Sequence, residues 1–237
     1  MLLMLLAAPV RAATVVELFT SQSCSSCPPA DALLTELDRS RPDLLVLAYH
    51  VTYWDRLGWR DPYSLQASTD RQRSYAARWP DDGLYTPQIV VQGTHQAVGS
   101  DRAAVQAALG APRPAPVALT LTTDAAGLRI DVGAGAGLGR GSLMLVGFDP
   151  THTTPVGGGE NGGRTLMETN VVRSVTRVGV WDGGPVHLAA ARPAGERVAV
   201  LLQADDGAIL ASATPTSATP ASATVTSATV ARATVAR

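Results

Sequence analysis

The sequence predicts an α/β domain followed by a small all-β domain, and three features of the chain support this. Up to residue 110, short apolar runs alternate with segments whose apolar residues recur at helical spacing. A proline-rich stretch follows at 111–116, and beyond it the apolar residues alternate with a period of two. We therefore expect an α/β domain at 13–110, a stiff linker at 111–116 and a β-sandwich-like domain at 117–210.

The composition of the 237-residue chain excludes several classes of protein. The formal net charge is −1, charged residues make up 16% of the chain, and every basic residue is an arginine. We therefore expect no nucleic-acid partner, and chemistry that needs a lysine Schiff base is excluded. Since no segment approaches about 18 unbroken apolar residues, we also expect no integral membrane segment.

Residues 1–12 have the pattern of an abbreviated signal peptide. The apolar run Leu2–Ala8 is too short to span a bilayer, and Val10-Arg11-Ala12 matches the small-x-Ala pattern of a cleavage site. A charged segment before the apolar run is missing, which indicates either a shortened signal or a start placed too late. The alternative is a first core strand. We expect an exported protein, either periplasmic or secreted.

Strands and helices alternate in the predicted α/β domain. Thr14–Phe19 is a compact β-branched and aromatic run, and Asp43–Val51 is apolar on both faces, like a central parallel strand. Between them, leucines at helical spacing predict a helix from Ala30 to about Arg39. Further along we expect, in order, a helix over 64–79, a strand over 88–92, a hairpin return over 95–99 and a helix over 101–109.

The predicted β domain contains several strands separated by glycine-rich turns. Alternating apolar residues indicate strands at Val117–Leu121, Leu128–Val132, Ser142–Phe148, Thr165–Val178 and Arg197–Gln203. The tail at 211–237 consists of five-residue units rich in Ser, Ala and Thr, with no large side chain to pack. We expect this tail to be disordered.

The two cysteines of the chain, Cys24 and Cys27, form a Cys-x-x-Cys motif between the first predicted strand and the first predicted helix. In an exported protein such a pair can form a disulfide, but it closes too short a loop to stabilise the fold much. The helix N-terminus favours a thiolate. We therefore expect Cys24 to attack and Cys27 to resolve in thiol–disulfide exchange. A structural disulfide and half of a metal site are the alternatives, although zinc needs three or four ligands.

A second motif, Thr86-Pro87, directly precedes the predicted strand at 88–92. Thioredoxin-like folds carry a cis-proline at this point, facing the cysteine pair, where its neighbour pairs with an extended substrate. We therefore expect a cis bond before Pro87, with an ordinary trans-proline at an edge strand as the alternative. Together with the element order, the two motifs predict an α/β thioredoxin-like domain followed by the small all-β sandwich-like domain.

Several charged residues have more than one interpretation. Glu17, inside the first predicted strand, is either a buried acid that accepts the proton of Cys27 or a polar residue on a half-exposed strand. His50 is expected to be a hydrogen-bonded core residue, with a base or a metal ligand as the alternative. Arg71 and Arg73 are expected on a solvated helix face.

The aromatic loop after the second predicted strand also has two interpretations. It carries Trp54 and Trp59 together with Asp55 and Asp61. These residues form either a lid or substrate groove beside the cysteines, or a loop that packs onto the domain.

Distinctive short segments surround these motifs. They are Glu17–Gln22, Cys24–Asp31, His50-Val51, Tyr53–Asp55, Leu57–Trp59, Asp61-Pro62, Arg71-Gln72, Tyr85–Gln88, Glu160-Asn161, Gly163–Leu166, Asn170–Arg173 and Trp181–Gly183. In these segments the chain resembles a secreted bacterial family, domain of unknown function 1223, over residues 14–210. The resemblance implies a thioredoxin-like fold without a settled activity. Ser23 and Thr52 depart from the family pattern, which usually has glycine and aspartate at these positions.

The leading hypothesis is an exported thiol-disulfide oxidoreductase, a redox-active Cys-x-x-Cys protein. In it Cys24 attacks, Cys27 resolves, Pro87 shapes the substrate groove and Glu17 shuttles a proton. Thr86, Trp54 and Trp59 are the expected substrate-binding residues. The expected partner is a protein or small-molecule thiol or disulfide, and no cofactor or bound metal is expected. The alternatives are a non-catalytic secreted binding module with a static disulfide, and a copper- or zinc-binding thiol protein that also uses His50.

Overall fold

Strands and helices alternate up to residue 109, and strands predominate beyond it, in the computed structural model of the chain. The structure describes residues 13–79, 83–112 and 117–217. The expected signal peptide at 1–12, residues 80–82, the expected linker residues 113–116 and the expected tail beyond 217 lie outside the described residues. Among the residues described, no helix is both long and apolar enough to cross a lipid bilayer.

The elements predicted for the α/β domain all occur, close to their predicted limits. They are β1 (Thr14–Thr20), α1 (Pro28–Ser40), β2 (Leu44–His50), α2 (Gln66–Ala76), β3 (Gln88–Val91), β4 (His95–Val98) and α3 (Arg102–Leu109). The aromatic loop after β2 begins with a 3-10 helix that was not predicted, η1 (Thr52–Leu57). The rest of the chain forms β5 (Leu119–Asp124), β6 (Gly127–Val132), β7 (Gly141–Pro155), η2 (Gly159–Asn161), β8 (Thr165–Trp181), β9 (Val186–Ala190), β10 (Arg197–Ala204), β11 (Ile209–Ala213) and β12 (Thr216–Ser217).

A large mixed sheet runs through the molecule, with strand order β11-β10-β7-β8-β2-β1-β3-β4. Within it, β1 pairs in parallel with β2 and antiparallel with β3, and β3 forms a hairpin with β4. A parallel pair needs a crossover connection, which α1 provides between β1 and β2. The predicted fold class is therefore confirmed at the level of a mixed α/β architecture.

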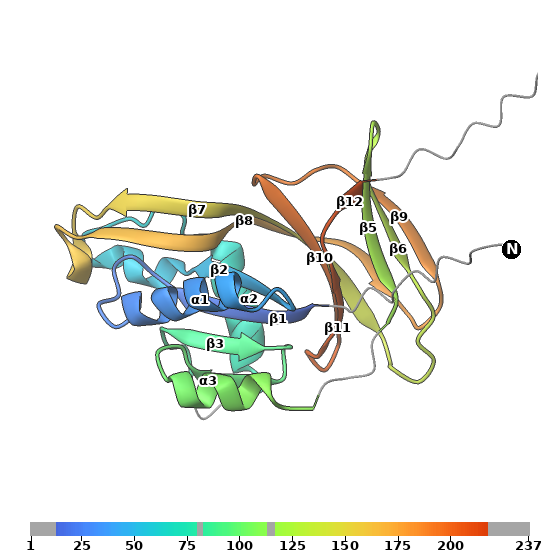
Figure 1. Ribbon diagram of the computed structural model, residues 1–237, viewed down its shortest axis with the longest axis horizontal. Coiled ribbons are helices and arrows are strands. Elements are labelled where there is room, and N and C mark those ends of the chain that lie inside the picture. The colour runs from blue at the N-terminus through green and yellow to red at the C-terminus, as the bar shows by residue number, and fades with distance from the viewer. Residues whose placement is uncertain (1–12, 80–82, 113–116, 218–237) are drawn as a thin grey trace, which may run out of the picture.

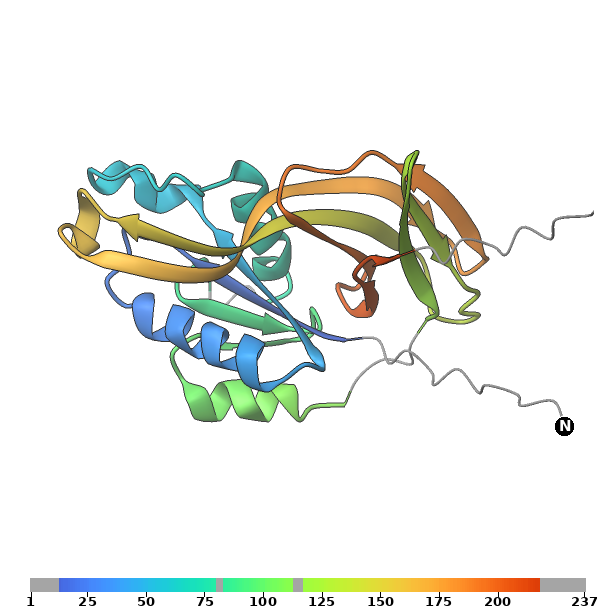
Figure 2. The same ribbon diagram turned by 45° about the horizontal axis from the view of Figure 1, so that its top comes forward.

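Helices cover both faces of the sheet around β1. On one face, Val16 and Leu18 pack against α1 and α3, which lie side by side (Figure 1). On the other face, Val15 and Phe19 pack with Tyr75. Tyr75 belongs to α2, which lies on the opposite side of the sheet from α1 (Figure 2). Because successive side chains of a strand point to opposite faces, a strand buried on both sides is apolar along its length, and β1 follows this rule between its terminal threonines except at Glu17.

The long hairpin of β7 and β8 connects the two parts of the molecule (Figure 1). Near the cysteine end, β8 runs parallel to β2, with Val171 opposite Ala48. Farther along, Leu143, Leu145 and Trp181 pack in one core with β5 and β6. The strands after the linker are therefore not confined to a separate sandwich. Their hairpin covers the edge of β2, whose N–H and C=O groups would otherwise remain unpaired.

The second sheet is small and has the order β12-β5-β6-β9. β5, β6 and β9 pair antiparallel, and the short β12 pairs in parallel with β5. β11 continues to Ala213, beyond the predicted end of the β domain at residue 210. The described part of the predicted tail therefore includes paired strands.

Candidate functional site

The cysteine pair lies in the loop between β1 and α1. Cys24 and Cys27 form a disulfide, and Cys27 is the residue that caps α1. Both cysteines are 0% exposed, whereas Ser25 and Ser26 between them are exposed. The predicted position at a strand-to-helix junction is confirmed, and the two sulfur atoms are shielded from solvent.

Hydroxyl groups contact the Cys24 sulfur. The Thr86 hydroxyl donates to Cys24 Sγ at 3.3 Å, and Ser26 Oγ lies 3.3 Å from the same atom. The two prolines that open α1 carry no N–H, and the next two N–H groups of the helix bind the carbonyl of Cys27. We expected the N-terminus of the helix to stabilise the cysteine sulfur. In the structure, the polar contact to Cys24 Sγ comes instead from Thr86, in a different part of the chain.

Thr86 and Pro87 lie beside the cysteine pair, and the peptide bond between them is cis, as predicted. The Pro87 carbonyl accepts the N–H of Gly99 at 2.8 Å. A Cβ at Gly99 would lie 3.1 Å from the Cβ of Pro87 and 3.0 Å from that of Ala30, so a larger residue would crowd both. The β3–β4 hairpin therefore packs Pro87 against the start of α1.

The tip of the β7–β8 hairpin, residues 156–164, covers the cysteine loop. The Glu160 carboxylate accepts hydrogen bonds from the backbone N–H of Ser25 at 2.8 Å and from its hydroxyl at 2.7 Å. Asn161 donates its side-chain amide to the carbonyls of Gln22, at 3.0 Å, and Cys24, at 2.8 Å. These contacts fasten the hairpin tip to the segment that carries the disulfide.

The two tryptophans of the aromatic loop have different surroundings. Trp59 donates its Nε1–H to the Gln22 side chain at 3.1 Å, and a Cβ at Gly157 would lie 2.8 Å from its ring. Trp54 packs, partly buried, against the core on the α2 side of the sheet. The loop is therefore packed onto the domain, and Trp59 lies between the cysteine loop and the hairpin tip.

Four buried ionisable residues from four separate segments act on one another through their charges. They are Asp31 of α1, His50 at the end of β2, Asp61 after η1 and Glu168 of β8. His50 Nδ1 lies 2.7 Å from Asp61, while His50 Nε2 lies 3.8 Å from Glu168. His50 is thus a hydrogen-bonded core residue, as expected. Within 13–79, 83–112 and 117–217, no group of three or more His, Cys, Asp and Glu side chains is arranged to hold a metal ion.

Burial and mutual charge shift the pKa values in this cluster. Burial lowers the pKa of His50, but the charges of Asp61 and Glu168 outweigh it and raise the pKa to about 9. Burial raises the pKa of Asp31 to about 7, and the charge of Glu168 adds to this effect. Burial also raises the pKa of Glu168, whereas for Asp61 burial is outweighed by His50 and the pKa is lowered. The negative charge of Glu168 therefore favours the protonated form of Asp31.

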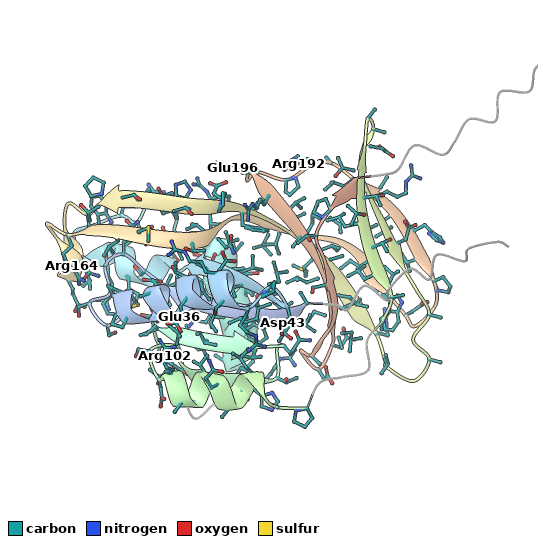
Figure 3. All side chains as sticks on the ribbon, in the orientation of Figure 1. Glu36, Asp43, Arg102, Arg164, Arg192 and Glu196 are labelled. Atoms are coloured by element: carbon teal, nitrogen blue, oxygen red, sulfur yellow. A yellow bond between two sulfur atoms is a disulfide. The ribbon has the colours of Figure 1, made fainter. Side chains whose placement is uncertain are left out.

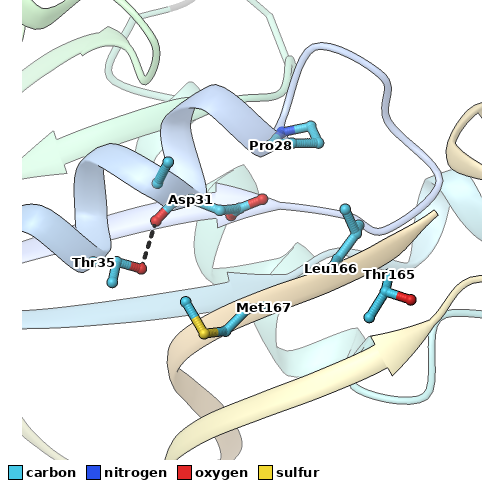
Figure 4. Close-up of a pocket in the computed structure, with 7 residues that line it drawn as sticks. Pro28, Asp31, Thr35, Thr165, Leu166 and Met167 are labelled. Atoms are coloured by element: carbon cyan, nitrogen blue, oxygen red, sulfur yellow. Dashed lines mark hydrogen bonds between the residues drawn. The ribbon is translucent and has the colours of Figure 1, made fainter.

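A cavity of about 250 Å³ opens beside Asp31, between α1 and β8. It is lined by Pro28, Asp31, Ala32, Thr35, Thr165, Leu166 and Met167. Figure 4 shows the residues of α1 facing those of β8 across this space. The cavity brings solvent close to a buried carboxyl group that lies one helical turn from Cys27.

Glu17 is fully buried, but its carboxylate is bound on the α2 side of the sheet. Arg71 binds both carboxylate oxygens, and the Tyr75 hydroxyl donates to one of them. The prediction that Arg71 lies on a solvated helix face is wrong, because its guanidinium turns inward to neutralise this buried acid. Arg73, by contrast, is exposed as expected.

Sequence reasoning did not single out Asp31, Glu168 or Asn161 as site residues. The position of Asp31 in the sequence could have indicated a role, because it lies four positions after Cys27 and therefore on the same helix face. The position of Glu168 is a weaker indication: it lies two positions after Leu166 and therefore faces the same side of its strand. Nothing local indicates that Asn161 would contact the cysteine loop.

The chain is similar to one protein family and to solved structures. The family model described as Protein of unknown function (DUF1223) matches residues 15–203. A crystal structure of a protein from Agrobacterium tumefaciens has 32% sequence identity and a TM-score of 0.71, covering 86% of this chain and 94% of that one. HBP35 of Porphyromonas gingivalis, at 16% identity and a TM-score of 0.61, covers 95% and 81% and shares the fold. None of the curated proteins matches the chain.

Proposed function

We propose that this chain, which belongs to the DUF1223 family of proteins of unknown function, is an exported thiol–disulfide oxidoreductase with a thioredoxin-like fold. The observation that carries the proposal is the hydrogen bond from the Thr86 hydroxyl to the Cys24 sulfur, beside the start of α1. Such a donor stabilises a thiolate more than a thiol, because hydrogen bonds to charged acceptors are stronger. Cys24 is therefore the sulfur that exchanges with substrate.

The proposed reaction begins with the protein oxidised. A thiolate of a reduced substrate attacks Cys24 Sγ, the bond to Cys27 breaks, and Cys27 leaves as a thiolate that takes up a proton. A second substrate thiolate then attacks the substrate sulfur of the mixed disulfide and releases Cys24. The substrate dithiol is oxidised to a disulfide, the protein disulfide is reduced to a dithiol, and two protons pass from substrate to protein. The reverse reaction follows the same steps backwards.

We assign proton exchange at Cys27 to Asp31 and not to Glu17, which the sequence had suggested. Cys27 has helical dihedral angles (φ −77°, ψ −39°), so the side chain four residues later lies over it on the same helix face. The pKa of Asp31, raised by burial to about 7, suits a group that both accepts and donates a proton near neutral pH. Glu17 is instead neutralised by Arg71 on the α2 side of the sheet.

The substrate is a protein or small-molecule thiol or disulfide that reaches Cys24 past the hairpin tip. Thr86, Pro87 and Trp59 border this approach, and Trp54 supports the loop that carries Trp59. Because Cys24 is fully buried, the tip at 156–164 has to move for a substrate sulfur to make contact. The signal-like pattern at 1–12 supports a periplasmic or secreted location, where such disulfides persist.

The proposal is tested by following disulfide transfer to a reduced peptide. Oxidised protein is mixed with a peptide carrying two thiols, and both are alkylated and counted at intervals. We expect protein thiols and peptide disulfides to appear in equal amounts, and to be absent from a Cys24→Ala/Cys27→Ala variant. A peptide that stays reduced while the protein disulfide persists would rule out the oxidoreductase.

The complete burial of both cysteines favours a second candidate function, a secreted binding module with a static disulfide. The contacts of Glu160 and Asn161 would then fix the loop permanently rather than cover a reactive centre. The double variant distinguishes the two candidates, because a binding module would lose no function when it folds without the disulfide.

A further inference from the structure

The buried ionisable cluster beneath the cysteine loop is larger than a single proton acceptor requires. Asp31, His50, Asp61 and Glu168 are all at most 7% exposed, and burying four such groups is costly unless they are paired. Only Asp31 lies one turn from Cys27 on the same helix. The other three come from β2, β8 and the loop after η1, and the oxidoreductase chemistry described above does not use them.

Asp61 fixes the orientation of His50. Its carboxylate accepts the backbone N–H groups of Gln22 and Tyr63, each at 2.9 Å, and also contacts His50 Nδ1 at 2.7 Å. An ionised carboxylate can only accept hydrogen bonds, so His50 Nδ1 carries the proton of this contact. His50 Nε2 consequently points toward Glu168, with no hydrogen-bond partner of its own in the described part of the chain.

Glu168 connects His50 to the helix that carries Asp31. One of its oxygens accepts the side-chain amide of Gln22 at 2.8 Å, and the other lies 3.8 Å from His50 Nε2. Next to it, Thr169 lies 2.9 Å from the hydroxyl of Thr35, which joins β8 to α1 one turn after Asp31. The charges of Glu168 and His50 therefore act on Asp31 in opposite directions, the first holding a proton on it and the second releasing it.

We propose that Glu168, His50 and Asp61 are positioning residues that set the proton occupancy of Asp31 and so control proton exchange at Cys27. This inference rests on the proposed function. When Cys27 leaves as a thiolate, Asp31 gives it a proton and becomes a carboxylate, and when a reduced Cys27 attacks, the proton returns. Among the described residues, further titratable groups that face the cluster are Tyr63, edge-on to His50, His152 of β7, whose charge acts on Glu168, and Asp55, which accepts the backbone N–H of Asp61.

The experiment measures the titration of Asp31 and the exchange rate together, in the full chain. The carboxyl carbon of Asp31 is followed by ¹³C NMR against pH in the wild type, Glu168→Gln and His50→Gln. The rate at which each reduced protein reacts with a small aromatic disulfide is measured over the same pH range. Glu36→Gln is the matched control, because Glu36 lies on the exposed face of α1, paired with Arg102 (Figure 3).

We expect the two variants to shift in opposite directions. Loss of the negative charge in Glu168→Gln should lower the Asp31 midpoint by about one pH unit, and loss of the positive charge in His50→Gln should raise it by a similar amount. The pH profile of the exchange rate should shift in the same direction as the Asp31 midpoint in each variant. In an Asp31→Asn background, neither Glu168→Gln nor His50→Gln should shift the pH profile. Asp31 midpoints that stay in place, or that move in the same direction, would overturn the inference while leaving an active oxidoreductase intact.

Two further outcomes are decisive. A wild-type pair that does not exchange at any pH would overturn the proposed function and this inference with it. If the variants do not fold, the Asp31 titration of the wild type is compared between its oxidised and reduced forms. A midpoint that depends on the redox state of Cys27 supports the coupling, and identical midpoints contradict it.

Discussion

Asn161 donates its side-chain amide to the backbone carbonyl of Cys24 at 2.8 Å, across 137 positions of the sequence. This bond ties the tip of the β7–β8 hairpin to the loop that carries the disulfide. The same amide group also binds the carbonyl of Gln22, and Glu160 holds Ser25 beside it. A strand hairpin that begins in the second part of the molecule thus covers the cysteines of the first part.

Replacement of Asn161 by alanine should expose the disulfide. The buried Gln22 carbonyl would lose its donor, and the Cys24 carbonyl would keep only the N–H of Cys27 at 3.2 Å. A buried group left without a partner costs about 1–3 kcal/mol, so the hairpin tip should detach more often. We expect a phosphine reductant to open the Cys24–Cys27 bond several-fold faster than in the wild type. Thr123→Ala, on the exposed side of β5, is the control. Equal reduction rates in all three proteins would show that the tip does not restrict access.

Thr86→Val should slow the reaction of Cys24 without changing the fold. Valine keeps the shape of threonine but removes the hydroxyl that donates to Cys24 Sγ. Since a hydrogen bond to a charged acceptor contributes about 1.5–3 kcal/mol, we expect the reduced protein to react with a small disulfide about tenfold more slowly. Thr120→Val in β5 should react at the wild-type rate. An unchanged rate for Thr86→Val would show that the Thr86 hydroxyl does not activate Cys24.

The stability of the protein should fall as the pH rises from neutral to about 9. The pKa of His50 is about 9 in the folded protein against an ordinary value of 6.5, so its protonated form contributes fully below pH 6.5 and is lost as the pH rises through 9. Asp31, with a raised pKa of about 7, acts in the same direction at lower pH. We expect a loss of about 3 kcal/mol in the free energy of unfolding from His50. Urea unfolding of His50→Gln should show a weaker pH dependence, and an identical one would contradict the charged pair.

The buried pair of Glu17 and Arg71 should behave as a structural unit. Glu17→Gln leaves the guanidinium buried without its counter-charge, which should destabilise the fold by about 3–5 kcal/mol. The double variant Glu17→Gln/Arg71→Met should recover part of this loss. Glu36→Gln, which breaks an exposed ion pair with Arg102, should leave the unfolding midpoint in place. If Glu17→Gln is as stable as the wild type, the pair does not hold the fold.

The sequence was sufficient for the first half of the fold and for the position of the cysteines. Apolar runs predicted β1 and β2, leucine spacing predicted α1, and the Thr86-Pro87 motif predicted the segment that contacts Cys24. These features are local, because each depends on side chains a few positions apart. The sequence pattern also predicted β7 and β8 as strands, but not that β8 would pair with β2.

The surroundings of the disulfide could not be predicted in the same way. The contact of Asn161 with Cys24, and the approach of Glu168 to His50, join segments more than a hundred residues apart. Such contacts follow from the path of the hairpin and not from any local pattern. Arg71 was misplaced for the same reason, because the acid that turns it inward lies on β1.

In the proposed function, Cys24 exchanges with substrate and Cys27 resolves. The most direct measurement is the yield of mixed disulfide when Cys27→Ala and Cys24→Ala variants, each with one remaining thiol, are incubated with an oxidised peptide and analysed by mass spectrometry. We expect a mixed disulfide on Cys24 to accumulate in the Cys27→Ala protein, because no second thiol can release it, and little adduct on Cys27 in the Cys24→Ala protein. The absence of adduct in both variants, or a preference for Cys27, would contradict the proposed function.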